Sequence, residues 1–185
     1  MKKILLYTFV IFIFFGNAVA YSKDRDVKLN LLFEELKKSN NDSVTLEIEM
    51  KIWNIWSTHP TQEKLTQLLS KGSGLMSKGE LKAAYEIFST IIKTTPDWAE
   101  GWNKRATVLY LMGRYQESLK DINEVLKLES RHFGALSGQG LVQTKLKNYE
   151  KAIESYQAVQ KIHPSIKAAK VMIPHLRKLI KEGVI

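Results

Sequence analysis

The fold of this sequence is limited above all by a repeat: similar residues recur every 34 positions, in three copies. A repeat of this length is a single supersecondary unit that cannot bury its apolar face alone, so the units must stack on one another. The recurring columns hold these residues: Leu68, Trp102 and Leu136; Gly72, Ala106 and Gly140; Leu81, Tyr115 and Tyr149; Ala84, Ser118 and Ala152; Phe88, Ile122 and Tyr156; Ile91, Val125 and Val159; Pro96, Ser130 and Pro164.

Each unit has the pattern of two helices joined by a short turn. Apolar residues within a unit recur at spacings of three and four, which indicates amphipathic helices and not strands. The two columns of small residues stand twelve positions apart, where they would allow the helices to approach closely at their crossing. Gly79 and Gly113, and Asn148 in the third unit, mark turns of the kind that a left-handed helix cap prefers.

These columns resemble the tetratricopeptide repeat (TPR) family, with units at 65–98, 99–132 and 133–164. The resemblance implies an all-α array of helical hairpins, a right-handed superhelix whose concave face binds peptides or partner helices. Two phrases, residues 102–107 and 131–136, also resemble small exported alphaproteobacterial TPR proteins. The family pattern is carried by Trp102, Ala106, Tyr115, Ser118, Ile122 and Ser130 in the second unit, and by Tyr149, Ala152, Tyr156 and Pro164 in the third.

The segments on either side of the repeats are expected to cap the array. Residues 21–64 read as a degenerate helical hairpin, with one apolar face at positions 29, 32, 33 and 36. Residues 44–52 alternate like a strand, but a lone strand would have no partner, and we favour a helix from Ser43 to Ser57. Residues 165–185 form a C-terminal capping helix, which Pro174 should kink or split.

The first twenty residues predict export. Lys2 and Lys3 precede an apolar run of about a dozen residues, and Ala18 to Ala20 offers a cleavage site, so residues 1–20 read as a signal peptide cut after Ala20. An uncleaved membrane anchor is the alternative. Either interpretation places the rest of the chain outside the cytoplasm, and we expect a periplasmic protein of a bacterial envelope. Export makes nucleic acid a poor candidate partner despite the net charge of +9.

No residue pattern indicates catalysis, a cofactor or a metal site. The chain has no cysteine. Its histidines do not share a helix face, and His59 and His163, each followed by proline, are expected to be turn residues. Gly134, Gly138 and Gly140 follow no strand and therefore do not form a phosphate loop. Gly140 belongs to the small-residue column, whereas Gly134 and Gly138 either soften their helix or let a partner backbone come close.

The expected role is therefore a non-enzymatic interaction module. A basic protein held at the membrane surface, by charge or by the uncleaved anchor, is the alternative. The TPR resemblance implies a groove lined by the first helix of each unit, and a carboxylate clamp is not expected because Leu69 and Ser73 stand where its Lys and Asn would be. The candidate groove residues are Leu69, Ser73, Met76, Asn103, Thr107, Tyr110, Ser137, Leu141 and Lys145.

Overall fold

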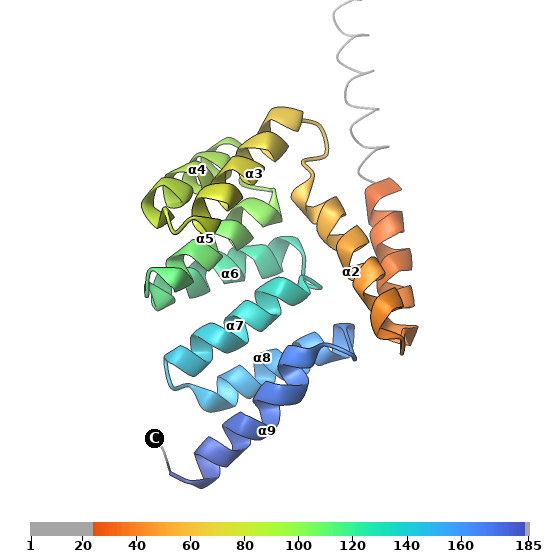
Figure 1. Ribbon diagram of the computed structural model, residues 1–185, viewed down its shortest axis with the longest axis vertical. Helices are drawn as coiled ribbons and strands as arrows, with labels where there is room; N and C mark the ends of the chain where they lie inside the picture. Colours follow the sequence, from red (N-terminus) through yellow and green to blue (C-terminus); the bar gives the residue numbers. More distant parts are fainter. Residues whose placement is uncertain (1–23, 184–185) are drawn as a thin grey trace, which may run out of the picture.

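The computed structural model describes residues 24–183 of the chain, and within that range every regular element is a helix (Figure 1). The predicted signal at residues 1–20 lies outside the described residues. The helices are an N-terminal helix (residues 24–38), α2 (Asp42–Ser57), α3 (Glu63–Ser77), α4 (Leu81–Thr94), α5 (Ala99–Leu111), α6 (Tyr115–Leu128), α7 (Phe133–Lys145), α8 (Tyr149–Ile162) and α9 (Lys167–Lys181).

Three helical hairpins, α3–α4, α5–α6 and α7–α8, stack in chain order, and α9 packs on α8 at the far end (Figure 1). Gly79 and Gly113 close the first two hairpins with φ of 79° and 75°. In the third hairpin the left-handed residue is Lys147, with φ of 60°, and not Asn148, which instead caps α8. The position of the turn was predicted correctly, but the residue that bears the unfavourable conformation was not.

The small-residue columns mark the close crossings, as predicted. A Cβ atom built on Gly72 would lie 2.6 Å from the Phe88 ring, and one on Gly140 would lie 2.7 Å from the Tyr156 ring. In the middle hairpin the Ser118 hydroxyl donates a hydrogen bond of 2.8 Å to the Ala106 carbonyl. A serine therefore replaces the family's alanine here without leaving its hydroxyl unpaired.

Residues 44–52 belong to a helix, α2, and the strand alternative was wrong. The Asn41 side chain caps this helix by accepting hydrogen bonds from the backbone N–H groups of Ser43 and Val44. One face of α2, including Ile48 and Ile52, is buried against the N-terminal helix and the array. We call residues 24–57, the N-terminal helix together with α2, the N-terminal hairpin.

The N-terminal hairpin does not stack in front of α3, where a terminal cap would lie. It runs along one side of the array, against the loops that precede α5, α7 and α9 (Figure 1). The Trp98 indole N–H donates to the Trp56 carbonyl at 2.9 Å, and Trp56 stacks on His132 with ring centroids 4.0 Å apart. His163 Nε2 lies 2.6 Å from a carboxylate oxygen of Glu49. The aromatic residues of α2 are buried by rings in these loops, which α3 does not offer.

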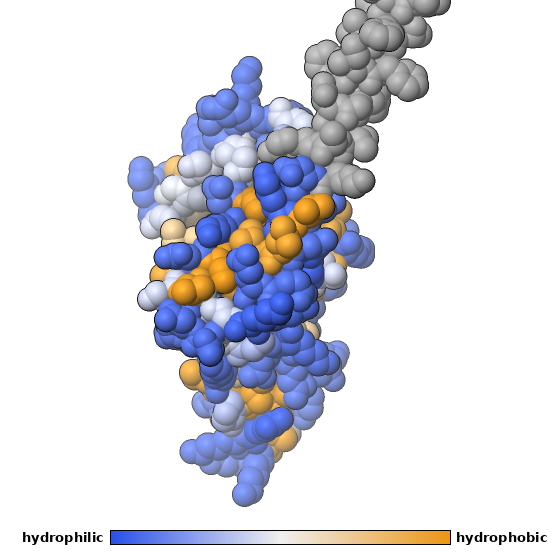
Figure 2. Space-filling model, turned by 90° about the vertical axis from the view of Figure 1, so that its right-hand side faces the viewer, coloured by the Kyte–Doolittle hydropathy of each residue, from blue (hydrophilic) through white to orange (hydrophobic). Residues whose placement is uncertain are grey.

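The docking of the N-terminal hairpin explains why residue 134 is a glycine. A Cβ atom at that position would lie 2.5 Å from Trp53 Cη2, so the glycine admits a ring of the chain itself. On the outward side of the N-terminal hairpin, Figure 2 shows a band of apolar side chains. The large apolar residues exposed on the hairpin are Val27, Leu31, Val44, Leu46 and Met50.

The C-terminal helix α9 caps the array by burying Ala169, Ile173 and Leu176 against α8. Pro174 lies inside α9 without splitting it. Proline has no N–H to donate to the carbonyl four residues earlier, but Pro174 is on the exposed side of α9, where water can bind that carbonyl. Among the helices of residues 24–183, none is both long and apolar enough to cross a bilayer.

Candidate functional site

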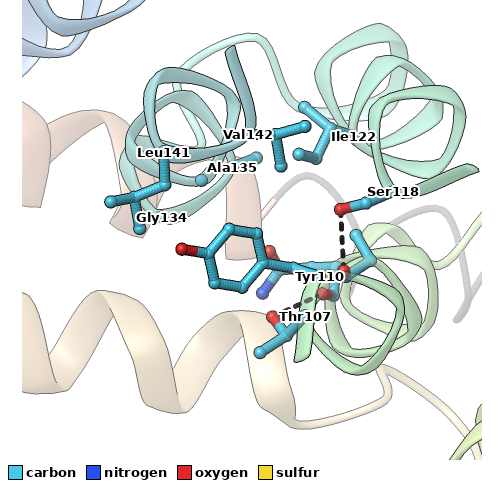
Figure 3. A pocket seen from close by; sticks show the side chains of 11 residues that line it. Thr107, Tyr110, Ser118, Ile122, Gly134, Ala135, Leu141 and Val142 are labelled. Atoms are coloured by element: carbon cyan, nitrogen blue, oxygen red, sulfur yellow. Dashed lines mark hydrogen bonds between the residues drawn. The ribbon is translucent and has the colours of Figure 1, made fainter. Parts of the chain in front are cut away.

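A small apolar pocket opens between α5 and α7, the first helices of the second and third repeats. Its volume is about 80 Å³. Figure 3 shows the ring of Tyr110 projecting from α5 into the space between the two helices, with Leu141 and Gly134 on α7. The residues lining it are Asn103, Ala106, Thr107, Tyr110, Ser118, Ile122, Gly134, Ala135, Gly138, Leu141 and Val142.

The pocket exists because α7 lacks side chains where it faces α5. A Cβ atom on Gly138 would approach only Ile122 Cδ1, at 3.8 Å, so the space beside this glycine is open. Leu141 is 42% exposed and offers an apolar wall. Thr107 and Ser118 already donate their hydroxyl protons to backbone carbonyls, at 3.0 Å and 2.8 Å. The pocket therefore presents mainly apolar surface to an entering group.

Four of the predicted groove residues meet at this pocket: Asn103, Thr107, Tyr110 and Leu141. Lys145, at the end of α7, is exposed outside it. Ser73 donates its hydroxyl proton to the Leu69 carbonyl at 2.9 Å, and Met76 packs on the core of the first hairpin. The predicted groove residues of the first repeat thus do not join those of the second and third.

Leu69 is a correction to the predicted groove. Its side chain is 3% exposed and packs with Leu65, Phe88 and Trp98 in the core of the first hairpin. Asn103, in the same position of the second repeat, is also buried, so this position faces inward in both repeats. Ser137, in the same column, also has a buried hydroxyl oxygen, one without a hydrogen-bond partner among the described residues.

A buried ionic cluster lies next to the pocket, and no pattern of residues predicted it. Glu100 is 1% exposed, and its carboxylate receives hydrogen bonds from His132 Nε2 and Asn103 Nδ2, each at 3.1 Å. Lys104 Nζ lies 3.1 Å from the other oxygen and 5.7 Å from the centroid of Trp53. The cluster connects the groove wall to the N-terminal hairpin.

The cluster keeps Glu100 ionised. Burial by itself would raise the pKa of the Glu100 carboxyl, but the hydrogen bond from His132 and the charge and hydrogen bond of Lys104 outweigh it, so the pKa lies below its ordinary value. His132 Nδ1 accepts a hydrogen bond from the Ala135 backbone N–H, which leaves the proton on Nε2, facing the carboxylate. Asn103, which lines the pocket, is held by the same carboxylate, so the orientation of its amide is fixed.

Two loop histidines, His132 and His163, contact the N-terminal hairpin, and His59 lies in the turn that follows it. His59 Nδ1 accepts from the backbone N–H groups of Thr61 and Gln62, and His163 pairs with Glu49. Both lie in turns, as predicted, but they are buried there. Burial lowers the pKa of His59. No cluster of three or more potential metal ligands occurs within residues 24–183.

A wider crevice of about 570 Å³ lies between the N-terminal helix and the loop before α5. Its walls include Asp26, His59, Gln62 and Asp97, and they carry as much polar as apolar surface. It has no convergent set of side chains like those around Tyr110. The pocket between α5 and α7 is therefore the stronger candidate site.

The arrangement of the hairpins agrees with the comparisons to known proteins. Residues 99–132 and 134–166 each match the tetratricopeptide repeat family. A TPR repeat-containing protein of Rhizobium etli is 32% identical over 161 residues, which make up 85% of this chain and 75% of that protein. The chain is a TPR protein. Two of its three repeat units carry the family matches, and the pocket lies between those two.

Other TPR proteins are similar over shorter stretches. Hsp70-Hsp90 organizing protein 3 of Arabidopsis thaliana is 30% identical over 94 residues, which cover 51% of this TPR protein and 17% of the plant protein. The first TPR domain of Spaghetti (RPAP3), solved with an HSP90 peptide bound, superimposes with a TM-score of 0.62 at 18% identity. That likeness covers 64% of this chain and 94% of that domain, and it shows a shared fold.

Proposed function

We propose that this TPR protein is an exported, non-enzymatic interaction module that binds a peptide segment or helix of another protein at the groove between α5 and α7. The observation that carries the proposal is the apolar pocket of about 80 Å³ beside Gly138. Small-molecule sites usually measure roughly 300–1,000 Å³, so this pocket suits one side chain of a larger partner. An apolar cavity of about 150 Å³ holds benzene, so an aliphatic side chain is the fitting size here.

The surroundings of the pocket support a peptide occupant. Tyr110 and Leu141 provide apolar contact, and the polar residues Asn103 and Thr107 also line the pocket. Apolar pockets for single side chains, flanked by polar groups, are how grooves recognise peptides. The RPAP3 domain, whose fold this chain shares, was solved with a peptide bound.

The proposed ligand differs from a chaperone tail held by a carboxylate clamp. The clamp's first lysine position is Leu69 here, which is buried, and its asparagine position is Ser73, whose hydroxyl bonds to its own helix. We therefore propose recognition by an aliphatic anchor and not by a terminal carboxylate.

Selection from a displayed random-peptide library, followed by calorimetric titration of the selected peptides, tests the groove. Gly138→Leu places a side chain in the pocket and should weaken binding by more than tenfold, since a buried anchor commonly contributes about 2 kcal/mol or more. Gly74→Leu is the matched control, because Gly74 is exposed in α3 and a Cβ there meets nothing within 4 Å. Equal affinity for wild type and Gly138→Leu would exclude this pocket as the anchor site.

Export is a separate part of the proposal and rests on residues 1–20. The mass of the protein recovered from cell envelopes and periplasm should correspond to a chain that begins at Tyr21. A protein found only in the cytosol would contradict export, whereas an envelope protein that begins at Met1 would show that the segment is an uncleaved anchor.

A further inference from the structure

The outer face of α9 carries charge of a single sign. Its sequence contains five basic residues and no acidic one from Lys167 to Lys181. The helices on the outer side of the repeats differ: α6 carries acidic and basic residues joined as pairs, such as Lys127 with Glu124 at 2.7 Å, and α8 has two glutamates and two lysines. A capping helix must be polar outside, but this requirement does not select one sign.

All five basic side chains are on the surface. At 100° per residue they fall within one arc, opposite the buried Ala169, Ile173 and Leu176. Lys167 lies 3.5 Å from Asp42 and Lys178 lies 3.7 Å from Glu182, but these side chains are 85% and 72% exposed, so the pairs hold them weakly. Within residues 24–183, the remaining three have no ion-pair partner: Lys170, Arg177 and Lys181.

The position of α9 leaves this face free. It is the last helix of the array, its packing partners are α8 and α7, and no other helix of the described chain covers its outer side (Figure 1). Val171, 67% exposed, stands among the basic residues. The surface is thus a cationic ridge whose exposed apolar residues are Val171 and Pro174, with a crevice only at its first residue, Lys167.

We propose that this face of α9 docks on an anionic lipid membrane surface. Protein interfaces have an apolar core and are poor in lysine, and a ridge with four lysines and one exposed valine provides no such core. A charged bilayer needs only a cluster of about four to eight basic residues, each contributing about 1 kcal/mol near the surface. The five charges of α9 meet that requirement, and Val171 can enter the headgroup region.

The test uses the full chain and vesicles of phosphatidylcholine with and without phosphatidylglycerol. The wild-type protein should sediment with the anionic vesicles at low salt and be released at high salt, because exposed charges are screened. Replacing Lys170, Arg177 and Lys181 by glutamine should weaken binding on the order of a hundredfold. The matched control replaces Lys82, Lys93 and Lys120, which are exposed on α4 and α6, and should bind as the wild type does.

A second measurement identifies the docked face. The chain has no cysteine, so Val171→Cys accepts a single polarity-sensitive dye. Its emission should shift to the blue on anionic vesicles, whereas a dye at Glu86→Cys, exposed on α4, should not respond. The proposal would be overturned if both triple variants lost binding equally or if the dye at position 171 did not respond. It would also be overturned if the protein bound polyglutamate and not vesicles, because the ridge would then be a site for an acidic protein.

Discussion

Gly134 and Gly138 stand one helical turn apart in α7 and allow a matched test of how the N-terminal hairpin docks. Replacing a glycine in a helix interior by alanine gains about 0.8–1 kcal/mol of helix stability, which applies to Gly138, whereas Gly134 is the second residue of α7 and gains less. The surroundings differ. A new Cβ at position 138 is in ordinary contact with Ile122 at 3.8 Å, whereas one at position 134 would lie 2.5 Å from the Trp53 ring.

The Trp53 ring has little freedom to move aside. It is in edge contact with the rings of Trp56, His132 and Phe133, each with centroids 5.4 Å away. Overpacking of this kind costs about 1–3 kcal/mol. Gly138→Ala should therefore raise the free energy of unfolding by about 1 kcal/mol, and Gly134→Ala should lower it by up to about 2 kcal/mol.

Urea unfolding followed by far-ultraviolet circular dichroism measures both variants against the wild type. Trp53→Ala provides the decisive background, because Gly134→Ala should become stabilising once the ring is removed. The two substitutions should thus show a coupling of about 1–3 kcal/mol in a double-mutant cycle. If Gly134→Ala stabilised the wild-type protein as much as Gly138→Ala does, the contact between α2 and α7 would not be the reason that residue 134 is glycine.

Three further outcomes follow from the contacts. Lys147→Gly should stabilise the protein by up to about 1 kcal/mol in thermal unfolding, because it removes a left-handed non-glycine residue. Arg105→Lys should cost about 1.5–3 kcal/mol in urea unfolding, since Arg105 makes two hydrogen bonds of 2.7 and 2.8 Å to Asp121 that lysine cannot reproduce. The Glu100 carboxylate, with a lowered folded pKa, should contribute stability above its unfolded pKa of 4.5 that is lost as pH falls through the lower folded pKa. Wild type should therefore lose stability more steeply than Glu100→Gln on acidification below pH 4.5, and equal slopes in urea titrations would contradict the assignment.

The repeating part of the fold could be predicted because its contacts are local. Gly72 meets Phe88 within one unit, and the 34-residue interval displays that relation three times. The groove residues could be predicted only where equivalent positions of neighbouring repeats line the same pocket. Tyr110 and Leu141 come together on neighbouring units, but Leu69, in the same column as Asn103, became part of the core because a leucine is stabilised by burial.

The place of the N-terminal hairpin could not be predicted, because its contacts join residues far apart in a part of the chain that does not repeat. Trp53 and Trp56 indicate that their helix is buried, but they do not indicate which part of the chain buries it. Gly134, which no turn explains, and the histidines at unit boundaries leave room for a docked ring, but neither identifies the segment that supplies it. Glu100 gave no such signal, since a glutamate in the first turn of a helix is common on a surface.

The contact between Glu49 and His163 spans 114 positions of the chain. Arrays of this kind ordinarily fold and fray unit by unit, since each repeat touches only its neighbours. Here the N-terminal hairpin cannot complete its contacts until the third repeat has been synthesised. These contacts raise the contact order above that of an array of neighbours alone, so folding should be slower than for such an array. In the native state, amide hydrogen exchange in α2 and α7 should proceed through one shared opening instead of independent ones.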